Sequence, residues 1–242
     1  MVDIHCHILP GIDDGSKSWE MTAEMCQVAI ADGITHIVAT PHSNDMYDYN
    51  RERFTEMLGQ LSDAAEGKLT FSIGCDFHFS YDNIQDALEN PRRYTIGDSQ
   101  YLLIEFSDYG IPPSVEQDLF AFSSRGLVPI ITHPERNRPL MQNPEMVLKF
   151  VEQGCLVQVT ANAVTGGWGS RSQKLAEWLL KREAVHVIAS DAHDPVRRKP
   201  VMSEARDAVA QMMGDLVANA LVTDNPGAII EGKSVPYQPM FR

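Results

Sequence analysis

Two histidines near the start of the chain have the spacing of a metal site. His5 and His7 are separated by Cys6 within a short apolar segment, so in a strand both imidazoles would point to one face and Cys6 to the other. An acidic loop that contains Asp14 and ends in a glycine follows directly. Paired neutral imidazoles beside carboxylates bind divalent metals. One H-x-H pair is a weak motif, so the prediction depends on what the rest of the chain supplies.

Residues able to bind metal also follow almost every other apolar segment of the chain. Asp191 and His193 share a face in the same way as His5 and His7, because one residue separates them. The candidate ligands are His5, His7, Asp14, His42, Asp76, Glu105, His133, Asp191 and His193. These are too many for one ion, so we predict a cluster of manganese, iron, zinc or magnesium ions with bridging carboxylates. Ordinary polar caps at strand ends would explain any one of these residues, but not the whole set.

Apolar, β-branched segments recur along the chain with helical patterns between them. The predicted strands cover residues 2–6, 34–40, 69–75, 101–106, 128–132, 156–160 and 185–190. The predicted helices cover residues 18–32, 51–66, 114–124, 144–153, 170–182, 203–213 and 215–221. This alternation predicts an α/β fold built on parallel strands. In a parallel barrel the carboxyl ends of the strands form one face, so the candidate ligands would converge there.

The chain is predicted to form one domain over residues 1–242, with residues 232–242 as a loosely held tail. Its formal net charge of -13 argues against binding to nucleic acids or anionic membranes, which needs a basic surface. No apolar run approaches the roughly 20 residues that span a bilayer, and the N-terminus lacks the pattern of a signal peptide. The four cysteines are scattered without C-x-x-C spacing and indicate reduced thiols, so we expect a cytoplasmic protein.

Three further histidines have other interpretations. His36 lies inside a predicted strand and His186 lies near the start of one, so we interpret both as structural. His78 shares strand parity with Asp76 and lies just beyond it, so we predict that His78 lines the substrate pocket.

Taken together, the motifs resemble the polymerase-and-histidinol-phosphatase (PHP) superfamily, and within it the bacterial protein-tyrosine phosphatases of capsule and exopolysaccharide loci. The matching segments are Asp3-Ile4-His5-Cys6-His7, Asp13-Asp14-Gly15, Thr40-Pro41-His42, Leu103-Ile104-Glu105-Phe106, Thr132-His133-Pro134-Glu135-Arg136, Ala189-Ser190-Asp191-Ala192-His193 and Asp224-Asn225-Pro226. Each segment is short, but in this order they extend over nearly the whole chain.

The resemblance implies a distorted seven-stranded, TIM-like β/α barrel that holds three divalent metal ions, with manganese as the expected metal. Carried over by position, the first ion would bind His5, His7, Asp76 and Asp191, the second Asp76, Glu105 and His133, and the third Asp14, His42 and His193. Asp76 departs from the family pattern, which usually has a glutamate there. The shorter side chain can still bridge two ions, and it leaves their spacing and occupancy open.

The resemblance also implies two arginines that bind phosphate, and they match Arg136 and Arg198. A guanidinium group presents a fork of donors to phosphoryl oxygens as charge develops on them. Arg136 lies three residues beyond His133, in a loop expected at the same face. Next to Arg198, both Arg197 and Lys199 could take its place.

The predicted reaction is metal-assisted hydrolysis of a phosphomonoester, in which a hydroxide held between two ions attacks phosphorus in line. A tyrosine leaving group, with a free pKa of about 10, needs less protonation than an alkyl alcohol, which fits the lack of a dedicated general acid. The resemblance implies that the substrate is phosphotyrosine on a protein. The expected partner is a bacterial tyrosine kinase that regulates capsule or exopolysaccharide synthesis.

The residues argue against several other enzyme classes. No cysteine has an arginine six positions later, as a cysteine phosphatase requires, and no G-x-x-x-x-G-K motif indicates a nucleotide kinase. A carbon–nitrogen amidohydrolase commonly uses a lysine at a strand end, but the only lysine between His42 and His133 is Lys68, just before a strand. Histidinol phosphate or nucleic acid as the substrate stays open, and so does a non-catalytic regulatory partner of a tyrosine kinase.

Overall fold

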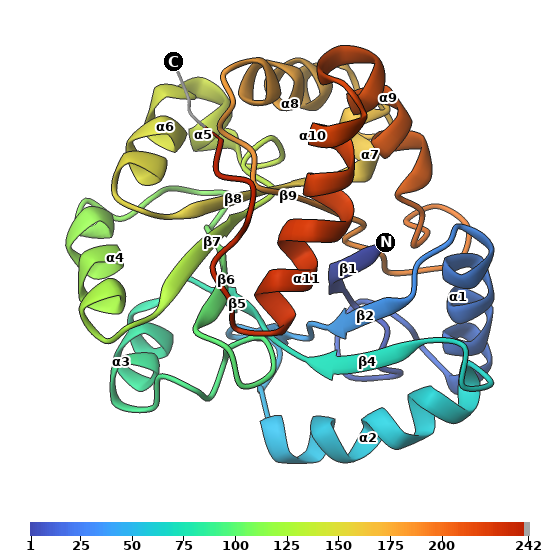
Figure 1. Ribbon diagram of the computed structural model, residues 1–242. Coiled ribbons are helices and arrows are strands. Elements are labelled where there is room, and N and C mark those ends of the chain that lie inside the picture. Colours follow the sequence, from blue (N-terminus) through green and yellow to red (C-terminus); the bar gives the residue numbers. More distant parts are fainter. Residues whose placement is uncertain (240–242) are drawn as a thin grey trace.

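The computed structural model describes residues 1–239, and in it strands alternate with helices (Figure 1). The strands are β1 (Val2–Cys6), β2 (His36–Ala39), β3 (His42–Ser43), β4 (Thr70–Ile73), β5 (Asp76–His78), β6 (Tyr101–Glu105), β7 (Val128–Thr132), β8 (Leu156–Thr160) and β9 (Val187–Ala189). The helices are α1 (Trp19–Ala31), α2 (Arg51–Ala64), α3 (Tyr81–Glu89), α4 (Val115–Ser124), α5 (Arg138–Gln142), α6 (Glu145–Glu152), α7 (Ala161–Val164), α8 (Ser170–Lys181), α9 (Ser203–Met213), α10 (Asp215–Asn219), the π-helix η1 (Ala220–Asp224) and α11 (Asn225–Ile230).

All paired strands are parallel, and they form two sheets with the orders β1-β2-β4 and β3-β5-β6-β7-β8-β9. This arrangement confirms the predicted α/β fold with parallel strands. Among the described residues, no helix is long and apolar enough to cross a membrane.

Two predicted strands are each followed by a short strand that was not predicted, and the break between them separates the sheets. The predicted strand 34–40 contains β2, and β3 begins after Pro41, which has no N–H to continue the ladder. The predicted strand 69–75 contains β4, and β5 begins after a break at Gly74, where an added Cβ would lie 3.0 Å from Val38 Cγ1. Hydrogen bonds from Gly74 N to Ala39 O (2.8 Å) and from Asp76 N to Pro41 O (3.1 Å) keep these strands side by side.

Backbone hydrogen bonds also connect the last strand to the first. Asp191 N donates to His5 O, and His7 N donates to Ala192 O, both at 2.8 Å. Cys6 and Ala192 form a parallel bridge. The predicted strands therefore follow one another in the order of a ring, which the two breaks distort.

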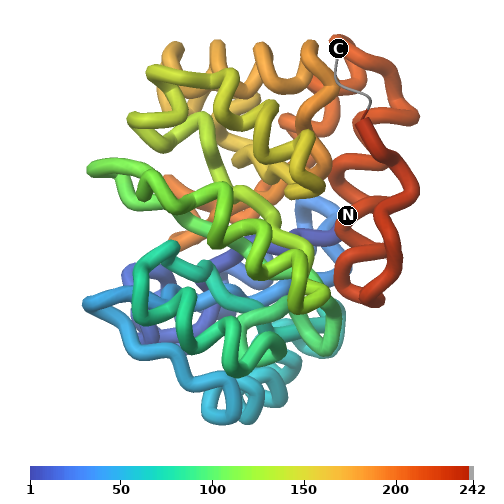
Figure 2. Tube along the Cα trace, turned by 90° about the vertical axis from the view of Figure 1, so that its left-hand side faces the viewer, coloured from blue at the N-terminus to red at the C-terminus, as the bar shows by residue number. Residues whose placement is uncertain are grey.

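The amino ends of the strands are covered by the last part of the chain. Ile229 of α11 and Val235 are buried in a cluster with Ile4, Leu103 and other strand residues. Tyr101, the first residue of β6, donates its hydroxyl hydrogen to Lys233 O at 2.8 Å. Figure 2 shows these last segments, in red, along one side of the molecule. The predicted loose tail covers 232–242, of which 240–242 lie outside the described residues. The carboxyl ends of the strands are left for the candidate site.

The boundaries of helix α1 follow the capping signals of the sequence. Helix α1 begins after Ser18, whose hydroxyl accepts a hydrogen bond from Met21 N at 3.3 Å, and Gly33 follows the helix with a φ of +84°. Met25 and Ala29 lie on its buried face, as the apolar spacing predicts. Such helices fix the strands whose carboxyl ends carry the ligands.

Candidate metal centre

The predicted ligands meet at the carboxyl ends of the strands, and His5, His7 and Asp76 form the first of three groups able to hold an ion. The Nε2 atoms of His5 and His7 are 3.3 Å apart. Asp76 Oδ2 lies 3.4 Å from His5 Nε2 and 3.9 Å from His7 Nε2. Asp191 Oδ1 lies 3.6 Å from both Nε2 atoms. The structure thus brings together the four residues predicted for the first ion, all of them buried.

The second group contains His42, Asp76 and Glu105, from β3, β5 and β6. His42 Nδ1 lies 3.2 Å from Asp76 Oδ2 and 3.6 Å from Glu105 Oε2. The prediction placed His133 with these two carboxylates, and His133 Nε2 lies 3.7 Å from Glu105 Oε1. Glu105 therefore presents one oxygen to each histidine. Asp76 Oδ2 faces both the first and the second group, as a bridging ligand would.

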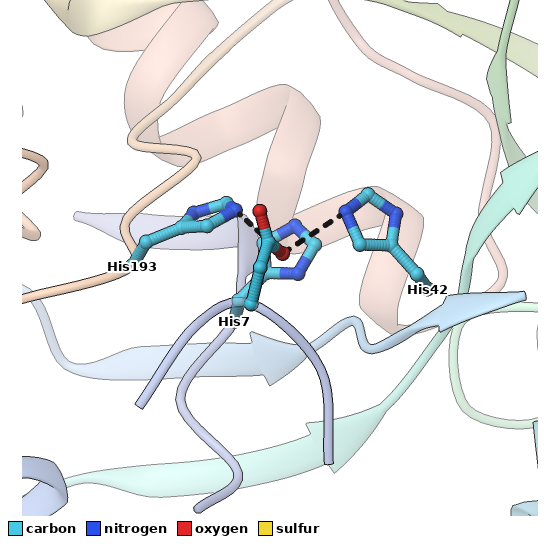
Figure 3. A group of neighbouring side chains, drawn as sticks. His7, His42 and His193 are labelled. Carbon is cyan, nitrogen blue, oxygen red and sulfur yellow. Dashed lines mark ion pairs between the residues drawn. The ribbon is translucent and has the colours of Figure 1, made fainter. Parts of the chain in front are cut away.

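The third group contains His7, Asp14, His42 and His193. Asp14 Oδ1 lies 3.3 Å from His42 Nε2 and 3.3 Å from His193 Nε2. Figure 3 shows the three imidazoles around this carboxylate, from three different segments of the chain. The prediction named three of these residues and placed His7 with another ion. The Asp14 side chain is 48% exposed, so this group lies at the solvent edge of the cluster.

Two of the predicted ligands have a strained backbone. His133 has a φ of 31° and Asp191 a φ of 52°, in the left-handed region that non-glycine residues seldom adopt. His133 directly follows β7 and Asp191 lies two residues beyond the end of β9, where the chain turns so that the side chain faces the cluster. The surrounding packing holds these conformations in place.

The donor atoms fit divalent cations. Among the described residues, both carboxylate oxygens of Asp76 and the Nδ1 atom of His42 are buried without a hydrogen-bond partner. Leaving such atoms unpaired costs about 1–3 kcal/mol each, and more for charged groups. Mixed nitrogen and oxygen donors without thiolate suit manganese, iron, zinc or magnesium. The residues present therefore match the predicted kind of metal site.

The cluster strongly perturbs the protonation of its own histidines. Burial alone would lower the pKa of His5, but the charges of Asp76 and Asp191 raise it to about 9. Burial also opposes protonation of His42, but its close contacts with the carboxylates of Asp14 and Asp76 raise its pKa to about 11. Burial, together with the nearby charge of His193, lowers the pKa of His7 to about 4. Protons therefore compete with metal ions for the imidazoles beside carboxylates.

Other side chains orient the ligands. Asp13 Oδ2 lies 2.8 Å from His7 Nδ1 and accepts a hydrogen bond from His42 N at 3.1 Å. Gln158 Oε1 lies 2.9 Å from His5 Nδ1. Such contacts leave the Nε2 atoms of His5 and His7 free to face a cation. The sequence analysis assigned no role to Asp13 or Gln158. Asp13 could have been found because it precedes Asp14 in the acidic loop, whereas Gln158 is marked only by being polar within an apolar strand.

Gly15 allows the acidic loop to close on the first strand. A Cβ at this position would lie 2.2 Å from His7 O, so only glycine fits. Gly15 N donates to Asp13 Oδ1 at 2.9 Å, and Ser16 N donates to His7 O at 3.0 Å. These contacts hold the loop against His7.

The two predicted phosphate-binding arginines converge on one carboxylate. Arg136 Nη1 and Arg198 Nη2 both donate to Asp191 Oδ2, the latter at 2.8 Å. Both guanidinium groups also lie over the Trp168 ring, at 4.3 Å for Arg136 and 5.3 Å for Arg198. Asp191 thus turns one oxygen to the histidines and the other to the arginines. Trp168 is a further residue of the site that the sequence analysis did not name.

The neighbours of Arg198 point elsewhere. Arg197 is exposed, and Lys199 Nζ lies 3.9 Å from Glu204 Oε1. Of the three candidates in this loop, Arg198 is the one whose side chain contacts the cluster.

A cleft of about 510 Å³ opens over the metal centre. His78 lines it, with Nδ1 3.6 Å from Glu105 Oε2, and this contact raises the pKa of His78. Tyr47, Phe106 and Tyr109 give the cleft aromatic sides. The structure therefore places His78 in the cleft, where the sequence predicted it.

The two histidines interpreted as structural lie outside the cluster. His36 lies within hydrogen-bond distance of Thr70 Oγ1 (2.7 Å) and Ser72 Oγ (2.9 Å), both from β4. His186 Nδ1 accepts a hydrogen bond from Val157 N at 3.1 Å. Both contact a neighbouring strand, in keeping with the interpretation of these histidines as structural.

Comparisons with known proteins agree with this geometry. A family model described as capsular polysaccharide synthesis, CpsB/CapC, matches residues 1–231. The tyrosine-protein phosphatase YwqE of Bacillus subtilis is 30% identical over 99% of this chain and 95% of its own length. The tyrosine-protein phosphatase CpsB of Streptococcus pneumoniae is 32% identical over 95% of this chain and 98% of its own length.

A solved structure gives the same result at the level of the fold. Crystal structures of YwqE from Bacillus subtilis and CpsB from Streptococcus pneumoniae are described as unique metal-dependent tyrosine phosphatases. One of their chains superposes on this protein with a TM-score of 0.90 and 30% identity, and the match covers 100% of both chains. This chain belongs to the CpsB/CapC family of capsular polysaccharide synthesis proteins.

Proposed function

We propose that this protein is a metal-dependent protein-tyrosine phosphatase of the non-cysteine type. The observation that carries the proposal is the position of Arg136 and Arg198 on Asp191, whose other oxygen faces the metal-binding histidines. Phosphate-binding donors and metal ligands are thereby joined through one carboxylate. The CpsB/CapC relatives named as tyrosine-protein phosphatases support the same assignment.

The proposed metal content is three divalent ions, with manganese as the expected metal. Bound cations would activate water and offset charge on the phosphoryl oxygens. His5, His7, Asp76 and Asp191 would hold one ion, Asp76 and Glu105 with His133 or His42 a second, and Asp14, His42 and His193 a third.

The arginines would bind and orient the phosphoryl group. A guanidinium group has five N–H donors, so Arg136 and Arg198 keep donors for substrate while each contacts Asp191. The Trp168 ring beneath them limits their motion. Positioned donors of this kind stabilise charge that develops on the phosphoryl oxygens in the transition state.

The cleft favours an aromatic substituent on the phosphate. Tyr47 is stacked on His42 with a ring distance of 5.9 Å. Tyr109 and Met46 are exposed large side chains at the cleft, where the phenyl ring of phosphotyrosine would find apolar contact. Leaving-group protonation is least demanding for a phenol, and no dedicated acid is required in the proposal. His78 would line the pocket for this ring.

The proposed partner is a phosphotyrosine-bearing protein, with a bacterial tyrosine kinase of capsule or exopolysaccharide synthesis as the expected one. We also propose a cytoplasmic location. Its support is that Cys6, Cys26, Cys75 and Cys155 are free and buried, which fits a reducing compartment.

The test compares substrates on one preparation. Metal-stripped protein is reloaded with manganese and assayed with a phosphotyrosine peptide, histidinol phosphate and single-stranded DNA. We expect the phosphotyrosine peptide to be turned over fastest. Equal or faster turnover of histidinol phosphate would contradict the tyrosine assignment, and no turnover of any substrate would favour a non-catalytic binding partner.

A further inference from the structure

A basic groove lies beside the metal centre, between α5 and α8. Its volume is about 890 Å³. Four cationic side chains line it: Arg136, Arg138 at the start of α5, and Arg171 and Lys174 near the start of α8. Trp168 and Trp178 supply apolar surface. We call this feature the basic groove.

The charge of the groove is opposite to that of the protein. The chain has 33 acidic and 20 basic side chains, yet no carboxylate of residues 1–239 lines the groove. Arg138, Arg171 and Lys174 are exposed, and none of them forms an ion pair with a carboxylate of residues 1–239. By contrast, the cleft over the metal centre is lined by Asp14, Glu105 and further acidic residues. The groove therefore attracts an anionic partner.

The positively charged residues that α8 contributes to the groove do not stabilise that helix. Arg171 lies in the first turn of α8, where the helix dipole disfavours positive charge, and Lys174 follows at the start of the second turn. The first turn has no acidic residue, and the N-cap residue Gly169 offers no side chain to cap it. Residue types that weaken a helix end are expected at positions that serve a function.

The groove is continuous with the site of phosphate binding. Arg136 lines both the basic groove and the cleft over the metal centre. Its guanidinium group lies on Trp168, which also lines the groove. A polypeptide whose phosphate lies at Arg136 can therefore continue along α8. From Arg171 to Trp178 the helix rises about 10 Å, which is the length of about three residues of extended chain.

We infer that the basic groove binds an acidic segment of the substrate polypeptide, next to its phosphotyrosine, so that the protein selects phosphotyrosines in carboxylate-rich sequence. The inference rests on the proposed phosphatase function and adds to it a class of substrate sequence. Side-chain carboxylates of about three flanking residues would contact Arg138, Arg171 and Lys174.

The test compares two phosphotyrosine peptides that differ only in flanking residues, aspartate and glutamate in one and asparagine and glutamine in the other. A small phosphatase substrate, p-nitrophenyl phosphate, reports the metal centre alone. With the manganese-loaded protein we expect kcat/KM to be about tenfold higher for the acidic peptide, as the sum of several exposed charge pairs. The preference should shrink at high ionic strength.

Variants locate the effect in the groove. Arg171→Glu and Lys174→Glu should each lower the preference by about fivefold or more and leave p-nitrophenyl phosphate turnover unchanged. The matched control is Arg53→Glu on α2, which is also exposed and lies on the opposite side of the molecule from α8 (Figure 1). This control should keep the full preference.

The outcomes separate the two proposals. If both peptides are cleaved equally well, the groove inference is overturned and the phosphatase function stands. If no phosphotyrosine substrate is cleaved, the proposed function fails and the groove inference with it. If single-stranded DNA binds more tightly than the acidic peptide, and Arg171→Glu abolishes that binding, the groove serves a nucleic acid and the peptide inference is overturned.

Discussion

At the carboxyl ends of the strands, the imidazoles and carboxylates of the candidate metal ligands lie 3.2 to 3.9 Å apart, whereas at the amino ends the buried polar groups make ordinary hydrogen bonds. The buried side-chain atoms without partners among residues 1–239 belong to His42, Asp76, Glu135, Gln158, Trp168 and Arg198. All of these residues lie at the metal centre or beside it. The carboxyl-end region of the fold thus holds buried polar groups without partners, which are unfavourable for stability, and the rest of the fold keeps them in place.

The contrast between the two ends of the strands is largest at Asp76, which belongs to two of the candidate metal-binding groups. Asp76→Asn should reduce both metal content and phosphatase activity, the latter by about 1,000-fold or more, since residues that only orient ligands already change affinity by 10–100-fold. Elemental analysis and steady-state kinetics on the same preparations measure both quantities.

The control for this variant is Asp76→Glu, which keeps the negative charge and both carboxylate oxygens. It should keep its metal. Full metal occupancy in Asp76→Asn would remove Asp76 from the ligand set.

A second prediction concerns Arg136, one of the two arginines proposed to bind phosphate beside the metal centre. Arg136→Ala should lower kcat/KM about 100-fold, the range for removing one donor to a developing oxyanion, while metal content stays intact. Arg197→Ala, which removes an exposed arginine, is the matched control and should change little. Unchanged kinetics in Arg136→Ala would exclude this residue from phosphate binding.

A third prediction concerns Asp13, which contacts the ligand His7 and is expected to affect the affinity for metal. Asp13→Asn removes the charge next to His7 Nδ1 and should weaken metal binding about tenfold. Metal titration followed by calorimetry measures the affinity, and Asp48→Asn, an exposed acidic residue, is the control. Equal affinities in the two variants would show that Asp13 only supports the loop.

The amino-end region should respond to pH through His186. Burial lowers the pKa of His186 to about 4, so the unfolded chain binds a proton at this residue below about pH 6.5 while the folded protein does not. Stability from this residue is complete above pH 6.5 and decreases as the pH falls toward 4. Between pH 7.5 and 5.5 the loss is about 1 kcal/mol of unfolding free energy.

His186→Asn keeps an acceptor for Val157 N and cannot be protonated. Denaturant unfolding of metal-stripped protein at the two pH values should therefore show a smaller decrease for the variant than for the parent protein. An identical decrease in both would mean that His186 titrates in the same way in the folded and unfolded chains.

Much of the metal centre could be predicted from the sequence because strand parity and strand ends are local patterns. His5 and His7 face one side through simple alternation, and Asp191 and His193 come shortly after the end of β9. The assignment of ligands to separate groups was harder to predict. His42 belongs to two groups because of its position after the break at Pro41.

Contacts between distant segments could not be predicted in this way. Choosing Arg198 over Arg197 requires the path of the loop after His193. Gln158 becomes significant only beside His5, which lies 153 positions away in the sequence. Arg138 and Arg171 each resemble an ordinary surface cation until α5 and α8 place them along one groove.

Trp168 and Asp191 each contact both Arg136 and Arg198, so the two arginines share the same support. A change at one of them alters the surroundings of the other, and the cost of losing both should be well below the sum of the single losses. In evolutionary terms the four residues form one epistatic unit. Once one arginine is lost, selection on the other is relaxed, so the phosphate site is expected to be kept whole or lost whole.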